Sequence, residues 1–142
     1  MSNVLEFEGG IMTMMQWNDA LKVGHNVIDR NHLELVGLIN ELGDAMSIGR
    51  GAEICGDVLN ELATYTKAHF EIEDQLMTAH RYPAASEHMR EHADLAQKVV
   101  ELKGMHDAGV PTLSVFLLHF LMQWLTRHSL ESDKVLARGI SN

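Results

Sequence analysis

Seven side chains of the kinds that bind metals are spaced so that they would face one space inside a helical bundle. Two pairs among them have members four residues apart, so on a helix each pair projects from one face, one turn above the other. Imidazole and carboxylate are good ligands for first-row metals, and a set of seven suits two ions better than one. The set consists of His32, the pair His69 and Glu73, the pair His88 and His92, His128, and Asp133.

Ordinary core packing is the alternative explanation for each of these residues taken singly. A lone histidine on an apolar helix face is usually a hydrogen-bonded core residue, and one His-x-x-x-Glu pair is often no more than that. Glu73 is harder to explain in this way, because a buried carboxylate without a partner costs several kcal/mol. Metal ions would supply that partner and would hold the imidazoles neutral. The combined pattern therefore favours a metal site.

The spacing of His128 and Asp133 leaves one ligand open. Five residues apart on a regular α-helix, the two side chains differ in direction by about 140° and do not share a face. A local π-bulge, which is a feature often found at functional sites, would bring both to the same side. Spacing alone therefore does not decide whether Asp133 is a metal ligand.

Four long helical segments would position these residues. Residue Asp29 is a plausible N-cap for the first segment, and Pro111 suits the first turn of the fourth, where its missing N–H is not needed. Short loops between the segments predict an all-α, antiparallel up-down-up-down four-helix bundle over residues 29–142. Residues 1–28 are expected to form an N-terminal arm, anchored by Trp17 and Leu21. The expected helices cover residues 30–46, 53–80, 84–105 and 111–138.

The composition agrees with this architecture and excludes several classes of partner. The chain has 142 residues, enough for one domain, and is 46% hydrophobic with a net charge of −9. This charge argues against nucleic acid and against an anionic membrane surface, both of which attract basic patches. No apolar run approaches the length of a transmembrane helix, and the acidic N-terminus does not read as a secretory signal. The single cysteine, Cys55, fits a reducing compartment, so we expect a cytoplasmic protein.

Longer motifs surround the seven residues. They are Trp17…Val23-Gly24-His25…Ile28-Asp29-x-x-His32, His69-Phe70-x-x-Glu73-Asp74-x-x-Met77, Tyr82-Pro83…His88-x-x-x-His92 and Trp124-Leu125-x-x-His128-x-x-x-x-Asp133. Together they resemble the hemerythrin family, and more narrowly its single-domain bacterial members. The resemblance runs from residue 17 to about residue 137, and all seven ligand positions are filled. Asp74 departs from the pattern, since the family usually has a second, non-ligating Glu there.

The resemblance implies a centre of two non-haem iron ions, bridged by two carboxylates and by an oxo or hydroxo group. One iron would carry three histidines and the other only two, which leaves an open position where O2 binds. By position, the first iron takes His88, His92 and His128, the second takes His32 and His69, and Glu73 and Asp133 are the bridges.

Apolar side chains should line the O2 pocket and keep water out. Leu125 matches the family leucine that lies close to bound O2. Ile28, Phe70 and Trp124 are further candidates, for which core packing is the alternative role. The remaining histidines are not expected to bind metal: His25 would form a cap or support a ligand, and His80, His106 and His119 would face solvent or a helix end.

The resemblance favours a non-enzymatic protein that binds O2 reversibly for storage, delivery or scavenging. The residues agree, because no Glu in the chain is followed three positions later by His, as it is in carboxylate-rich di-iron proteins. Two alternatives stay open: sensing of O2, nitric oxide or redox state through a partner protein, and detoxification of peroxide or nitric oxide. The sequence also leaves open a redox or delivery partner.

Overall fold

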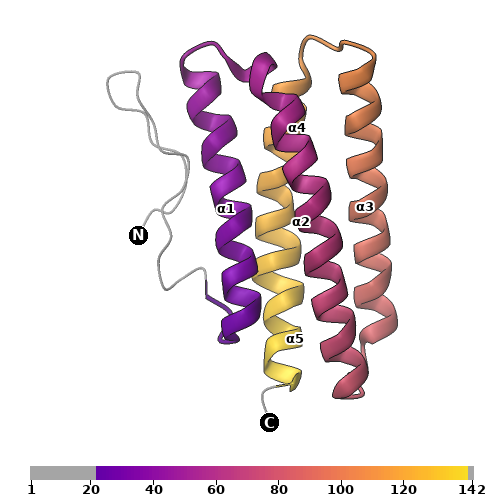
Figure 1. Cartoon of the computed structure of the whole chain (residues 1–142). Coiled ribbons are helices and arrows are strands. Elements are labelled where there is room, and N and C mark those ends of the chain that lie inside the picture. The colour runs from indigo at the N-terminus through magenta and orange to yellow at the C-terminus, as the bar shows by residue number, and fades with distance from the viewer. Residues whose placement is uncertain (1–21, 141–142) are drawn as a thin grey trace.

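The structure is a computed structural model, and it describes residues 22–140. Within this range the chain is all-α, and the long helices run alternately up and down (Figure 1). Trp17 and Leu21, the expected anchors of the N-terminal arm, lie outside the described residues. The elements are α1 (Asn26–Ser47), α2 (Gly51–Ala79), α3 (Ala85–Asp107), α4 (Leu113–Gln123), the π-helix η2 (Trp124–Ser132) and α5 (Asp133–Ile140).

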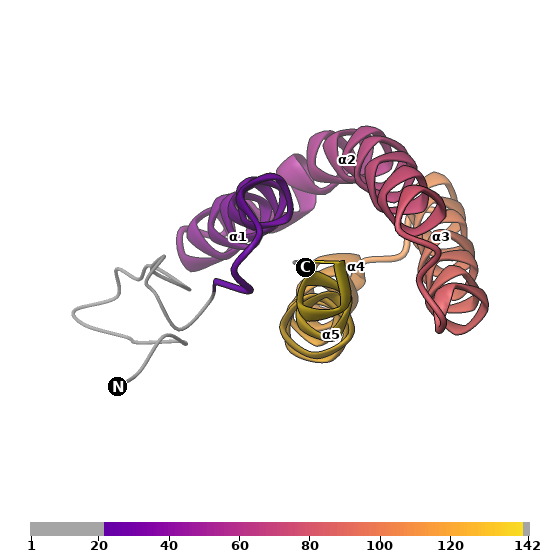
Figure 2. The same ribbon diagram turned by 90° about the horizontal axis from the view of Figure 1, so that it is seen from below.

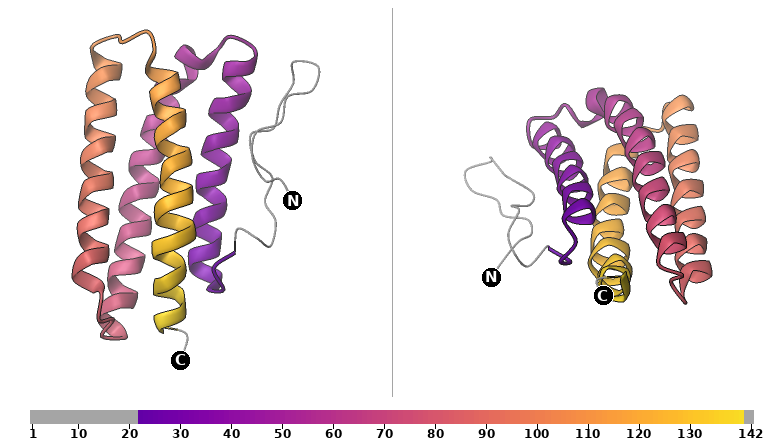
Figure 3. Two further views of the ribbon diagram at one scale, coloured as in Figure 1. Left: turned by 180° about the vertical axis from the view of Figure 1, so that it is seen from behind. Right: turned by 60° about the horizontal axis from the view of Figure 1, so that its bottom comes forward.

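The last three elements form one rod, which is the fourth helix of the bundle. Seen along the bundle, α1, α2 and α3 lie on an arc and the rod fills its concave side (Figure 2). From behind, the rod stands in front of the other helices, between α1 and α3 (Figure 3). It contacts all three of them. The expected antiparallel four-helix bundle is therefore confirmed.

The helix ends differ slightly from the expected ones. Helix α1 begins at Asn26, and its N-cap is His25, whose ring Nδ1 accepts a hydrogen bond from the backbone N–H of Ile28 at 3.5 Å. Asp29, the expected cap, lies inside the first turn and accepts a hydrogen bond from the N–H of Val23 at 2.7 Å. Asp29 thus ties the preceding segment to the helix rather than starting the helix.

The core consists of two apolar clusters separated by a polar layer. The larger cluster contains Leu35 of α1, Leu62 of α2 and Leu125 of the π-helix, together with most of the buried aliphatic residues. The smaller cluster contains Ile28, Met77 and Leu136. On each of these helices the expected metal ligands lie between the two clusters in sequence. The fold therefore encloses the polar layer in apolar packing on both sides.

Two further features bear on the sequence-based expectations. Cys55 is buried in the larger cluster and forms no disulfide. Among the helices of residues 22–140, none has the length and apolar character needed to cross a lipid bilayer.

Candidate metal centre

The structure brings all seven expected ligands together in the polar layer, and all seven side chains are buried. Helix α1 supplies one of them, α2 and α3 supply pairs at four-residue spacing, and the rod supplies the last two. Their ligand-type atoms fall into two overlapping sets, within each of which the atoms lie within 4.8 Å of one another. One set contains His88, His92 and His128, the other contains His32 and His69, and both contain Glu73 and Asp133.

The π-helix is what places His128 and Asp133 on the same side. The backbone N–H of Asp133 donates to the carbonyl of His128, five residues earlier, which is the hydrogen bond of a π-helix. The wider turn brings His128 Nε2 to 3.1 Å from Asp133 Oδ1. From the sequence, a π-bulge is an arrangement that would include Asp133, and the structure has a π-helix at this position.

The two carboxylates lie at the centre of the site. Glu73 Oε1 is 2.8 Å from His88 Nε2 and 2.9 Å from His92 Nε2. Asp133 Oδ2 is 2.7 Å from His32 Nε2. His69 lies between them, with its Nε2 at 3.2 Å from Glu73 and 3.3 Å from Asp133. Each carboxylate therefore contacts histidines of both sets.

Several of these atoms are close together without forming hydrogen bonds. The buried atoms without a hydrogen-bond partner include His69 Nε2, His128 Nε2, Glu73 Oε2 and Asp133 Oδ1. His69 Nε2 lies within hydrogen-bonding distance of both carboxylates, so the angle rather than the distance prevents a hydrogen bond. A buried polar atom left unpaired costs free energy, whereas nitrogen and oxygen lone pairs that converge without pairing suit a cation. The donor set thus fits metal ions better than it fits a hydrogen-bonded core.

Without metal, the carboxylates and most of the histidines stabilise each other's charged forms. Burial lowers the pKa of His69, but the nearby carboxylates of Asp133 and Glu73 outweigh it and raise the pKa to about 9. The same opposing effects raise the pKa of His88 to about 9 and that of His128 to about 10. Burial raises the pKa of both carboxyls, and the charge of Asp133 raises that of Glu73 further, but the neighbouring histidines hold both pKa values well below their usual range.

His92 behaves differently from the other histidines of its set. Burial lowers its pKa, the nearby Glu73 opposes this, and the charges of His128 and His88 lower it further, so the net shift is downward. Its ring stacks on Phe70, with centroids 3.9 Å apart and planes 8° apart. His92 is therefore the histidine of this half that the surroundings keep neutral.

In the part of the chain that the structure describes, carboxylate and hydroxyl side chains lie behind histidines of the three-histidine half. Glu91 Oε1 accepts hydrogen bonds from His128 Nδ1 at 2.8 Å and from the Ser132 hydroxyl at 2.6 Å. Asp74 Oδ1 lies 3.5 Å from His92 Nδ1. The Nδ1 atoms of His32, His69 and His92 are buried and have no hydrogen-bond partner. The sequence interpretation missed Glu91, although it lies beside His92 and three residues after His88.

The expected O2-pocket residues lie around the centre, but on different sides. Leu125 and Trp124 are buried in the larger cluster, and Ile28 is buried in the smaller one, four residues before His32. Phe70 packs on His92 and so lies against the three-histidine set. Their role in an O2 pocket stays a prediction.

The other histidines lie away from the seven. His80 is the C-cap of α2, and the ring of His119 lies 3.0 Å from the side chain of Gln123 on the exposed side of α4. His106 is exposed near the end of α3 and packs beside Gly56. His25 is the cap of α1. These positions agree with the expected capping or solvent-facing roles.

The chain is similar in sequence to a known protein family and to several known proteins. The family model described as "Hemerythrin HHE cation binding domain" matches residues 23–138. A protein named bacteriohemerythrin from Stenotrophomonas maltophilia is 32% identical over 126 residues, which cover 89% of this chain and 81% of that protein. One of the same name from Pseudomonas aeruginosa is 32% identical over 122 residues, covering 86% and 78%. Another from Methylococcus capsulatus is 29% identical over 132 residues, covering 92% and 99%.

Proposed function

The chain belongs to the hemerythrin family, and on that premise we propose that it binds O2 reversibly at two non-haem iron ions held by the buried polar layer. One observation supports this proposal above all others. Imidazole nitrogens and carboxylate oxygens converge at the centre of the bundle, several of them without hydrogen bonds. Such atoms are stable in an apolar interior when cations occupy the space between them.

The division of the ligand atoms into two sets supports an assignment of residues to the two ions. His88, His92 and His128 would hold one iron and His32 and His69 the other, with Glu73 and Asp133 shared between them. When bound, the iron pair supplies the electrons that reversible O2 binding requires. The smaller histidine set leaves the second ion with fewer protein ligands, so we place O2 binding on that side.

The chain's own residues would favour carriage of O2 over its activation. Two carboxylates among seven ligands give the ions little negative charge, and anionic donors are what stabilise high-valent iron. The apolar clusters on both sides of the layer keep water from the site, which slows oxidation of bound ferrous iron. We therefore expect storage, delivery or scavenging of O2 and no enzymatic turnover. Because the lone cysteine Cys55 is a buried free thiol, we place the protein in the reducing cytoplasm.

Metal analysis combined with optical spectroscopy tests this proposal. The iron-loaded protein is reduced without air, exposed to O2 and then evacuated, while its visible spectrum is followed. We expect two irons per chain and a coloured O2 form that bleaches under vacuum. A His119→Ala variant, changed at an exposed histidine outside the centre, should behave like the parent. Two zinc ions, one iron, or prompt irreversible oxidation would each rule the proposal out.

A further inference from the structure

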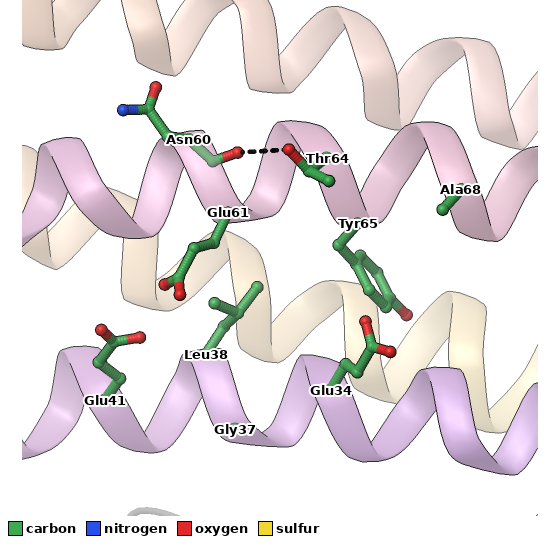
Figure 4. Close-up of a pocket in the computed structure, with 9 residues that line it drawn as sticks. All are labelled: Glu34, Gly37, Leu38, Glu41, Asn60, Glu61, Thr64, Tyr65 and Ala68. Atoms are coloured by element: carbon green, nitrogen blue, oxygen red, sulfur yellow. Dashed lines mark hydrogen bonds between the residues drawn. The ribbon is translucent and has the colours of Figure 1, made fainter.

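A groove between α1 and α2 lies next to the two-histidine half of the centre. Its volume is about 680 Å³, and Figure 4 shows the side chains that line it. Three of the lining residues are glutamates, and none is Lys, Arg or His. The acidic residues are Glu34 and Glu41 of α1 and Glu61 of α2.

The negative charge of the groove is not neutralised within it. Glu41 and Glu61 point toward each other from opposite helices (Figure 4). Burial raises the pKa of Glu41, and the neighbouring carboxylates of Glu61 and Asp57 raise it further. Carboxylates that repel one another in this way would be stabilised by a cation in the groove.

Tyr65 provides an independent reason to expect a ligand here. Its side chain is 4% exposed, and its hydroxyl is buried without a hydrogen-bond partner. The ring extends from α2 toward α1, so that the hydroxyl points into the groove on the side of Glu34 (Figure 4). A buried tyrosine hydroxyl normally has a partner, and an ammonium or guanidinium group in the groove would donate to its oxygen.

The same tyrosine connects the groove with the metal centre. The Tyr65 ring stacks on the ring of His69, with centroids 5.3 Å apart and planes 7° apart. A molecule seated in the groove is therefore separated from this expected iron ligand by a single aromatic side chain. The apolar packing that keeps water out of the centre leaves this short route between the surface and His69.

We propose that the groove between α1 and α2 is the docking site of a basic electron-donor protein that reduces the iron centre through the side of Tyr65 and His69. This inference rests on the proposed function, since an O2-binding iron pair that has oxidised must regain its electrons. In each encounter the donor loses one electron and one ferric ion becomes ferrous, so two encounters convert the diferric centre to the diferrous form that binds O2. Weak redox complexes have small interfaces, and charge complementarity steers the partners together.

The first experiment measures docking without electron transfer. The oxidised protein is titrated with an oxidised, lysine-rich cytochrome c at low salt by calorimetry. The groove variant Glu34→Gln/Glu41→Gln/Glu61→Gln should weaken binding about tenfold or more. The control variant Glu71→Gln/Glu87→Gln/Glu131→Gln removes the same charge from exposed positions outside the groove and should change binding less than about twofold. Equal losses in both variants, or no binding by the parent, would overturn the proposal.

The second experiment measures electron entry. Reduction of the diferric protein is followed with cationic hexaammineruthenium(II) and with anionic dithionite. The groove variant should be reduced about tenfold more slowly by the cation and no more slowly by the anion, and added salt should remove the difference. An unchanged rate with the cation would overturn the proposal. If the ruthenium complex depends on the groove but the cytochrome does not bind, the groove serves small cations and the protein partner is ruled out.

The two proposals fail in different ways. Docking of the oxidised cytochrome does not depend on O2, so a chain that docks it but shows no reversible colour would keep the surface and lose the O2 function. Tyr65→Phe retains the ring on His69 and removes only the hydroxyl. It should weaken docking severalfold while leaving reduction by dithionite unchanged, and unchanged docking would exclude the hydroxyl as a contact.

Discussion

The two halves of the metal centre share both carboxylates but differ in what lies behind their histidines. In the three-histidine half, Glu91 accepts a hydrogen bond from His128, and Asp74 lies near His92. In the two-histidine half, the outer nitrogens of His32 and His69 have no hydrogen-bond partner. Carboxylates behind a ligand histidine fix its ring and raise its basicity. His128 is thus held by a directed hydrogen bond behind its ring, whereas His32 and His69, and also His92, have no hydrogen-bond partner at the outer nitrogen.

This difference predicts that the two halves bind metal with unequal affinity. The largest effect is expected when a ligand residue is removed by mutation. His69→Ala should lose the ion of the two-histidine half and retain about one ion per chain, because the other half keeps its ligands. Glu73→Ala should retain far less than one, since it removes a ligand of both halves and leaves His88 and His92 without their acceptor. Metal analysis after dialysis against a weak chelator measures both outcomes.

Folding must be checked for both variants, because the Glu73 position is fully buried. Removing one partner of a buried charged pair costs roughly 3–5 kcal/mol, so circular dichroism and a thermal melt accompany the metal analysis. A folded His69→Ala variant that has lost both ions would show that the halves are not independent. That result would remove the basis of the comparison.

The spacing of the histidines predicted the ligand residues of this centre better than the residues that hydrogen-bond to those ligands. Residues four apart on one helix share a face whatever lies around them, so the pairs on α2 and α3 could be placed from the sequence. The place of Asp133 depended on a π-helix, and spacing could only state the condition. Glu91 was missed because it lies about 100° around α3 from His92 and faces another helix. Periodicity identifies side chains that share a face but not the neighbours they meet across the bundle.

An effect of intermediate size is expected in the metal-free protein, in the pH dependence of its stability. His69, His88 and His128 have folded pKa values of about 9, 9 and 10, against an ordinary value of 6.5. A histidine whose pKa is raised in the folded state contributes its full stabilisation below about pH 6.5, and this stabilisation is lost as the pH rises toward 9 and 10. The carboxyls of Glu73 and Asp133, whose pKa values are lowered in the folded state, stabilise the fold above about pH 4.5. This stabilisation is lost as the pH falls below about 4.5.

The expected result is therefore a stability maximum between about pH 4.5 and 6.5. Thermal melts of the metal-free protein from acid to alkaline pH measure it, and NMR of the histidine ring protons assigns the sites. His92 should be neutral at pH values where His128 is still protonated, since their pKa values shift in opposite directions. If His92 takes up its proton together with His128, the polar contacts of this half do not distinguish its histidines.

The smallest effect on metal binding is expected from a change at Glu91, the carboxylate that accepts a hydrogen bond from His128. Glu91→Gln keeps the size of the side chain but removes the charge that His128 and Ser132 contact. Loss of such a partner typically weakens metal binding 10–100-fold, and here the loss should fall on the ion of the three-histidine half. Competition with a chelator of known affinity, using cobalt(II) as a coloured probe, measures the affinity of each half separately.

Ser132→Ala and Asp74→Asn provide graded comparisons for this variant. Ser132 only orients Glu91, and Asp74 lies 3.5 Å from His92 without a hydrogen bond, so both substitutions should weaken the same half by less than Glu91→Gln does. Equal weakening of both halves by Glu91→Gln would mean that the carboxylate acts on the whole centre through the shared bridges. In that case the unequal number of histidines alone, rather than the residues behind them, would make the centre asymmetric.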